Sequence, residues 1–76
     1  MKRPMPETAR RIDQVVYESN LTDKAAAAKC GVSESVLRYW RIGETQMSQA
    51  NMWQFCTEFD VSADWLLGLS DTKERR

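Results

Sequence analysis

The apolar residues of this chain recur at helical spacing in five successive segments. Ile12, Val15 and Val16 form the apolar stripe of the first predicted helix, which runs from about Pro6 to Ser19. Residues three and four positions apart share one face of an α-helix, so each stripe predicts a helix with one side turned to a core. The remaining helices are expected over residues 23–30, over 33–42, from Ser48 or Asn51 to Phe59, and over 62–67. The pattern therefore predicts an all-α fold of five helices.

The second and third predicted helices are joined by a very short connection. Ala26, Ala27 and Cys30 share one face of the second helix, and side chains this small allow another helix to approach closely. Thr22 is expected to cap the start of this helix. Gly31 is expected to end it in the left-handed conformation that a helix terminus often needs. Ser33 then caps the third helix, so two tightly packed helices around a glycine turn are predicted.

The third helix separates its apolar and polar side chains sharply. Val36, Leu37 and Trp40 fall on one side and are expected to face the core. The opposite side is mostly polar and is expected to face solvent or a partner. It consists of Glu34, Ser35, Arg38, Tyr39 and Ile42.

The last two helices carry most of the remaining core and two tryptophans of different kinds. The fourth helix has an apolar stripe, and Val61 is expected in the core with it: Met52, Phe55, Cys56 and Phe59. Trp53 lies off this stripe, which suggests a contact surface, since tryptophan is enriched at interfaces. Trp65, in the short helix that Ser62 caps and Gly68 closes, suits either the core or an interface.

The chain resembles the phage-repressor and Cro-like (XRE-type) helix-turn-helix family. The resemblance rests on LTDKAAAAKCGVSESVLRYWRIG, on MSQANMWQFCTEFDVSADWLLG and on RRIDQVVYESN, which together cover about three quarters of the chain. It implies a compact, repressor-like DNA-binding domain over residues 6–69, with the helix-turn-helix at the second and third helices. A flexible basic segment, residues 1–5, would precede it, and a mobile tail, 70–76, would follow. The family also pairs through its fourth and fifth helices, which implies a homodimer with Trp53 and Trp65 at the interface.

The resemblance and the residue chemistry together assign expected DNA contacts. The family motif aligns Glu34, Ser35 and Tyr39 with positions that most often touch bases, and Arg38 can make a bidentate contact with guanine. Glu34 and Arg38 are also spaced to pair with each other, a contact that leaves base contact possible. The expected phosphate contacts are Thr22, Lys24, Ser33, Arg41, Gly43, Thr45, Gln46, Arg10 and Arg11.

Charge distribution supports this interpretation better than net charge, which is zero. Residues 1–43 carry eight Lys or Arg against five Asp or Glu, whereas residues 44–71 carry five acidic side chains and no basic one. This polarity places positive charge on the half with the helix-turn-helix. An ordinary solvated charged face is the alternative explanation.

Two residues depart from the family pattern. Asp23 stands where the family typically has glutamine, and Glu44 follows the closing glycine where a basic residue is common. A carboxylate beside a phosphate is repulsive, although Asp23 would be stabilised by the start of its helix.

Taken with the resemblance, the residue chemistry predicts a sequence-specific transcriptional regulator, of the repressor kind, that binds palindromic operator DNA as a homodimer through residues 33–42. The alternative is a protein-interaction module on the same fold, of the antitoxin or anti-repressor kind.

Other function classes find little support in this sequence. The chain has no histidine, no glycine-rich phosphate loop and no activated nucleophile pattern, so neither an enzyme, a metal site nor a cofactor is expected. Cys30 and Cys56 lie on apolar helical faces and are expected in the core, with a disulfide or a reactive thiol as the alternative. No apolar run is long enough to cross a membrane, so a cytoplasmic protein with no membrane partner and no evident small-molecule substrate is predicted.

Overall fold

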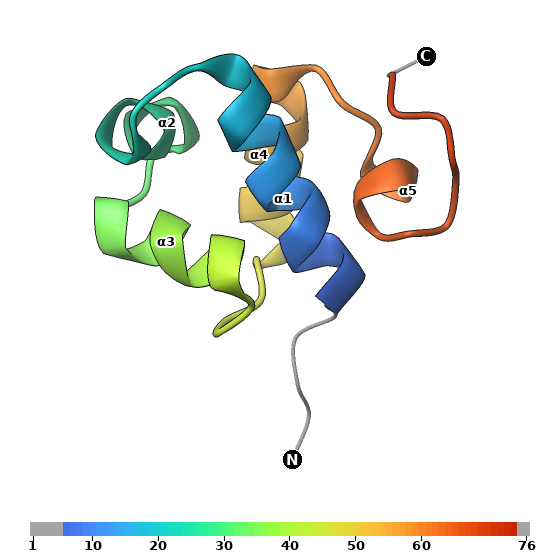
Figure 1. Ribbon diagram of the computed structural model, residues 1–76, viewed down its shortest axis with the longest axis horizontal. Helices are drawn as coiled ribbons and strands as arrows, with labels where there is room; N and C mark the ends of the chain where they lie inside the picture. The colour runs from blue at the N-terminus through green and yellow to red at the C-terminus, as the bar shows by residue number, and fades with distance from the viewer. Residues whose placement is uncertain (1–5, 75–76) are drawn as a thin grey trace.

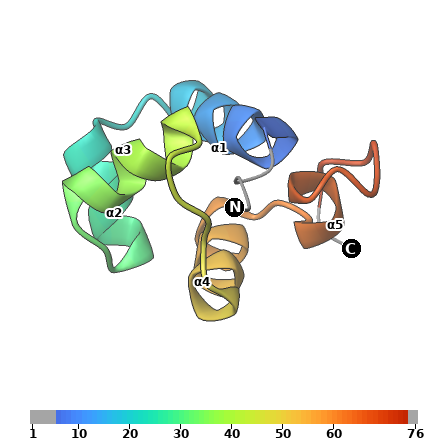
Figure 2. The same ribbon diagram turned by 90° about the horizontal axis from the view of Figure 1, so that it is seen from below.

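The computed structural model describes residues 6–74 and contains five α-helices (Figure 1). The helices are α1 (Pro6–Ser19), α2 (Asp23–Cys30), α3 (Glu34–Ile42), α4 (Gln49–Phe59) and α5 (Ala63–Leu66). Figures 1 and 2 show α2 and α3 on one side of α1 and α5 on the other, with α4 beneath α1. The predicted all-α, five-helix fold is confirmed. The segment 1–5, expected to be flexible, lies outside the described residues.

Four of the helices begin at a hydroxyl side chain, as the sequence predicts for three of them. Because the first turn of a helix leaves backbone N–H groups unpaired, an oxygen at this position stabilises the end. Ser48 accepts from the amide of Asn51 at 3.1 Å, which decides between the two caps considered for α4. The other capping residues are Thr22 for α2, Ser33 for α3 and Ser62 for α5.

The core lies where the apolar faces of the helices meet. Its largest fully buried side chains are Trp40, Phe55, Leu37, Leu66 and Val16. Cys30 and Cys56 are both free and buried, so their predicted place in the core is confirmed. Met52 and Phe59 are only partly buried and pack against the edge of this core.

The C-terminal segment folds back beside α5 (Figure 1). The amide of Ser62 donates to the carbonyl of Lys73 at 2.8 Å, and Val61 forms an isolated antiparallel bridge with Glu74. Lys73 also pairs with Glu18 of α1. These contacts show how residues 70–74 lie, whereas the mobility expected for residues 70–76 stays a prediction.

Candidate nucleic-acid interface

The turn between α2 and α3 holds the two helices in close contact. Gly31 has φ 72°, a left-handed value that side chains other than glycine rarely adopt, and its amide donates to the carbonyl of Ala28. Val32 donates to the carbonyl of Ala27 at 3.0 Å, which completes the end of α2. Ala26 and Ala27 are buried, so their methyl groups set the close approach of the helices. The turn predicted from the sequence is therefore present.

The outer face of α3 is exposed along its whole length. Leu37 and Trp40 are buried on the inner face, and Val36 is partly buried beside them. The predicted division of this helix into two faces is confirmed. The exposed residues are those expected to face a partner: Glu34, Ser35, Arg38, Tyr39 and Ile42.

Glu34 and Arg38 form an ion pair on this outer face. Nη1 of Arg38 lies 2.7 Å from Oε2 of Glu34, and about half of each side chain stays exposed. An exposed pair of this kind contributes only about 0.3–0.5 kcal/mol, so it is easily exchanged for another contact. Only Nη1 of the Arg38 guanidinium donates to Glu34, and the side chain is 52% exposed. The pair expected from the spacing is confirmed, and it leaves Arg38 able to donate to a base.

Thr22 and Ser33 mark the two helix starts that lie beside this face. The Thr22 hydroxyl oxygen accepts from the amide of Ala25 at 3.1 Å, and that of Ser33 accepts from the amide of Val36 at 3.2 Å. Each hydroxyl still has its own hydrogen to donate. A phosphate oxygen placed there would also meet the positive end of a helix.

The loop after α3 carries the other polar groups expected to contact DNA. Gly43, at φ 80°, ends the helix, and its amide donates to the carbonyl of Trp40. The amide of Glu44 likewise donates to the carbonyl of Tyr39 at 2.9 Å. Because these two amides are used within the helix end, the phosphate contact expected at Gly43 lacks its N–H donor. Thr45 and Gln46 remain the candidates in this loop.

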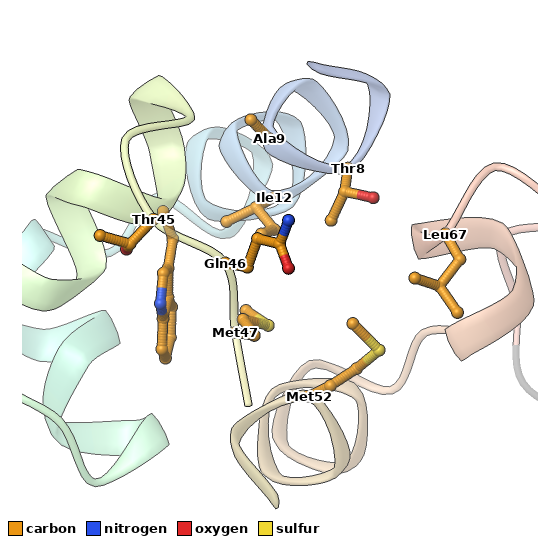
Figure 3. Close-up of a pocket in the computed structure, with 9 residues that line it drawn as sticks. Thr8, Ala9, Ile12, Thr45, Gln46, Met47, Met52 and Leu67 are labelled. Carbon is orange, nitrogen blue, oxygen red and sulfur yellow. The ribbon is translucent and has the colours of Figure 1, made fainter. Parts of the chain in front are cut away.

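A small cavity of about 70 Å³ lies beneath this loop (Figure 3). It is lined by Thr8, Ala9, Ile12, Trp40, Thr45, Gln46, Met47, Met52 and Leu67. Sites for drug-sized ligands measure some 300–1,000 Å³, so this space is far too small for one. We interpret it as the place where the loop seats against α1 and α4.

Arg10 and Arg11 have very different surroundings, although both were expected to contact phosphates. Arg10 is exposed and donates to Glu7 at 2.6 Å. Arg11 is only 15% exposed, donates to Glu7 and to the carbonyls of Trp65 and Ser70, and lies 4.9 Å from the Trp65 ring centroid. Hydrogen bonds from Arg10 and Arg11 lower the pKa of Glu7. Arg11 thus connects α1 to the C-terminal part of the chain and is not available to a phosphate. Arg10 is exposed, as Lys24 is, and stays a candidate phosphate contact.

Arg41 lies between two carboxylates from different helices. Nε of Arg41 is 2.7 Å from Oδ1 of Asp13 in α1, and Nη1 donates to Asp23 at the start of α2. Partial burial opposes its charge, but the hydrogen bonds to Asp13 and Asp23 raise the pKa of Arg41. Sequence reasoning missed Asp13 altogether. No local pattern marks a partner that lies 28 positions away.

The two tryptophans expected at a dimer interface differ in exposure. Trp53 is 67% exposed and borders a groove that Thr57, Ala63 and Asp64 also line. Trp65 is 6% exposed within the core cluster, and Arg11 and Lys73 lie over its ring. Trp53 therefore offers a partner a large apolar area, and Trp65 offers little.

Two further features of residues 6–74 bear on the functional class. No helix in this range combines the length and apolarity that crossing a membrane requires. Nowhere in it do three His, Cys, Asp or Glu side chains gather as a metal site would need.

Comparison with known proteins points to one family. The family model described as helix-turn-helix matches residues 16–66, about two thirds of the chain. The P22 c2 repressor protein, solved in complex with a synthetic operator, superposes with a TM-score of 0.80 at 21% identity, over 87% of this chain and 100% of that one. The restriction-modification controller protein C.AhdI from Aeromonas hydrophila gives 0.72 at 18% identity, over 79% and 91%. At these identities the likeness establishes the fold. No curated protein sequence is similar enough to count as a relative.

Proposed function

This chain belongs to the helix-turn-helix family, and from that premise we propose that it is a transcriptional regulator that binds double-stranded DNA sequence-specifically through α3. The observation that carries the proposal is the outer face of α3, a continuous exposed row of polar side chains on a helix anchored by Leu37 and Trp40. The major groove of DNA admits an α-helix, and each base pair presents a distinct pattern of donors and acceptors there. A rigid helix with such a face meets these requirements.

The proposed base contacts follow from the chemistry of four residues. Arg38 is assigned a bidentate contact with guanine, in exchange for its weak pair with Glu34. Glu34, once released, can accept from a cytosine amino group. Ser35 can donate or accept, and Tyr39 offers ring carbons to a thymine methyl or its hydroxyl to a phosphate.

Six other residues supply the proposed phosphate contacts. Thr22 and Ser33 lie at helix starts, and Lys24 and Arg10 are exposed and positively charged. Thr45 and Gln46 extend the set into the loop after α3. Because so few basic side chains are available, we expect binding per subunit to be weak compared with a strongly basic repressor.

We propose that the chain acts as a homodimer on a palindromic operator and represses transcription in the cytoplasm. One helix of this size contacts only a few base pairs, so useful specificity needs two copies about one helical turn of DNA apart. The exposed Trp53 beside a groove supplies an apolar surface for such a pairing. The P22 c2 repressor, which shares the fold, is itself a repressor bound to an operator in its solved structure.

The acidic departures favour a second candidate function, a module that binds another protein through this fold. Glu44 is exposed in the loop after α3, where it would repel phosphates. Asp23 gives the alternative less support than its charge suggests, because Arg41 pairs with it. Glu44 is therefore the main observation on the side of a protein partner.

Selection from a random pool of duplex DNA tests the proposal. The full chain is incubated with the pool at low ionic strength, and bound duplexes are amplified and sequenced over several rounds. We expect enrichment of a two-fold symmetric sequence whose binding weakens as salt rises. Absence of salt-sensitive binding to any sequence would overturn DNA binding and favour the protein-interaction module.

A further inference from the structure

Arg41 connects three helices at the border of the proposed DNA-binding face. It lies in the last turn of α3 and donates to Asp13 of α1 and to Asp23 of α2. Figures 1 and 2 agree in placing the C-terminal end of α3 beside α1. We call these three residues the Arg41 clamp.

Arg41 is less exposed, and has more hydrogen-bond partners, than a side chain that is free to bind a phosphate. Its side chain is 21% exposed, whereas that of Arg38, three residues earlier, is 52% exposed. Two of its three guanidinium nitrogens already donate to carboxylates. A phosphate would have to compete with two negative charges that are held in place.

The apolar inner face of α3 determines which side of the helix faces the core, but it sets the rotation of the helix only coarsely. Leu37 and Trp40 anchor the helix by apolar burial, which is strong but non-directional. A guanidinium fork bonded to carboxylates has a defined geometry, so it resists rotation and sliding. Arg41 is also adjacent to the residues expected to meet DNA. It lines one hollow together with Arg38, Tyr39 and Ile42, and with its own two partners.

We propose that Arg41, Asp13 and Asp23 are positioning residues, which fix the orientation of α3 and thereby set its sequence preference. This inference rests on the proposed function, since it concerns how the same face recognises DNA. It replaces the phosphate contact expected of Arg41. It also gives Asp23 a structural role, and the positive charge of Arg41 offsets the repulsion between Asp23 and phosphates.

The proposal predicts an effect opposite in sign to simple electrostatics. Asp23→Asn and Asp13→Asn each remove a negative charge near a polyanion, so electrostatics alone predicts tighter binding to every duplex. The clamp instead requires both carboxylates. Loosening α3 misplaces its side chains relative to the bases and lowers the preference for the selected duplex over a scrambled one.

Four variants of the full chain provide the test: Asp23→Asn, Asp13→Asn, Arg41→Lys and the control Glu44→Gln. Affinities are measured for the duplex selected by the unmodified chain and for a scrambled duplex of equal length and composition. Glu44 is an exposed carboxylate in the loop that follows α3 and makes no contact with Arg41, so Glu44→Gln removes one charge without touching the clamp. This control variant should bind both duplexes more tightly by the same factor and leave the ratio of the two affinities unchanged.

The clamp variants should lower the ratio of specific to scrambled affinity by about tenfold, the scale of one misplaced base contact. Arg41→Lys should do so although it keeps the positive charge, and the slope of log affinity against log salt should stay unchanged. If Asp23→Asn tightens both duplexes equally, as Glu44→Gln does, the proposal is overturned. A further variant, Arg41→Gln, removes the charge. If the slope of log affinity against log salt then becomes shallower by about 1 while the ratio of specific to scrambled affinity is unchanged, Arg41 is a phosphate contact instead.

Amide hydrogen exchange provides a measurement that does not depend on DNA. In Asp23→Asn, the amides of α3 should exchange faster while those of α4 keep their rates, because only α3 loses its constraint. Unchanged exchange in α3 would overturn the positioning role even if the chain selects no duplex. Failure of the selection alone would overturn the proposed function, so the two failures are distinguishable.

Discussion

The Arg38 guanidinium donates to the Glu34 carboxylate across 2.7 Å, one turn apart on the exposed face of α3. The acidic residue precedes the basic one by four positions, which is the favoured order for such a pair. The contact holds the long Arg38 side chain against its own helix while it is unbound. Its small free energy, about 0.3–0.5 kcal/mol, means that guanine can displace Glu34 at little cost.

Salt dependence tests the expected number of phosphate contacts. Each neutralised phosphate contributes about −0.9 to the slope of log affinity against log salt, so four to six contacts per dimer predict a slope near −4 to −5. Lys24→Ala should weaken binding to selected and scrambled duplexes equally and reduce the magnitude of the slope. A slope near −10, measured by fluorescence anisotropy over a salt series, would show that we have missed most of the contacts.

Loss of the buried Trp40 and loss of the exposed Trp53 should affect stability differently. Trp40 is 2% exposed in the core, so Trp40→Ala should lower the free energy of unfolding by about 3–5 kcal/mol. Trp53→Ala, at an exposed position, should change it by about 0.5 kcal/mol or less. Urea unfolding followed by circular dichroism measures both, and equal losses would contradict the described burial.

Trp53 should matter for assembly instead. We expect a weak homodimer in solution that DNA strengthens, with the Trp53 side chain in its interface. Trp53→Ala should then raise the dimer dissociation constant by roughly thirtyfold, the effect of a hot-spot residue worth about 2 kcal/mol. Tyr17→Ala is the matched control, since Tyr17 is an exposed aromatic residue on α1. A monomer at millimolar concentration in sedimentation experiments, with one copy bound per asymmetric site, would rule the dimer out.

The Cys30 thiol should be inert in the folded chain. Burial, with a smaller contribution from Glu58, raises the pKa of Cys30 from 9.0 to about 11. At pH 8 the folded protein should react with a disulfide reagent about a hundredfold more slowly than the unfolded protein, with mass spectrometry identifying the modified cysteine. The unfolded thiol loses its proton first, so this group's contribution to stability should decline between about pH 9 and 11. Equal rates at Cys30 in both states would contradict its burial.

Helix boundaries could be predicted from the sequence because local groups determine them. Thr22, Ser33 and Ser62 cap their helices through an amide three residues away, and Gly31 and Gly43 end helices by their own conformation. The faces of α3 could be predicted for the same reason, since helical periodicity alone divides them.

The ion pairs that join helices could not be predicted in this way. Arg41 meets Asp13 and Asp23 across 28 and 18 positions, and Arg11 meets the carbonyl of Trp65 across 54. Such contacts depend on how the helices pack, so a basic residue that becomes structural looks the same in sequence as one that waits for a phosphate. The DNA contacts and the dimer involve molecules other than this chain, and they stay predictions.

The most direct test of the account compares Arg38→Ala with the unmodified chain on the selected duplex and on its scrambled counterpart. Arg38 is exposed and pairs only with a neighbour on its own helix among the described residues, so its loss leaves the fold intact. We predict that affinity for the selected duplex falls by about 1–3 kcal/mol, while affinity for the scrambled duplex changes far less, so sequence preference relaxes. An equal loss on both duplexes would contradict base recognition by Arg38 and would leave specificity to Ser35, Tyr39 and Glu34.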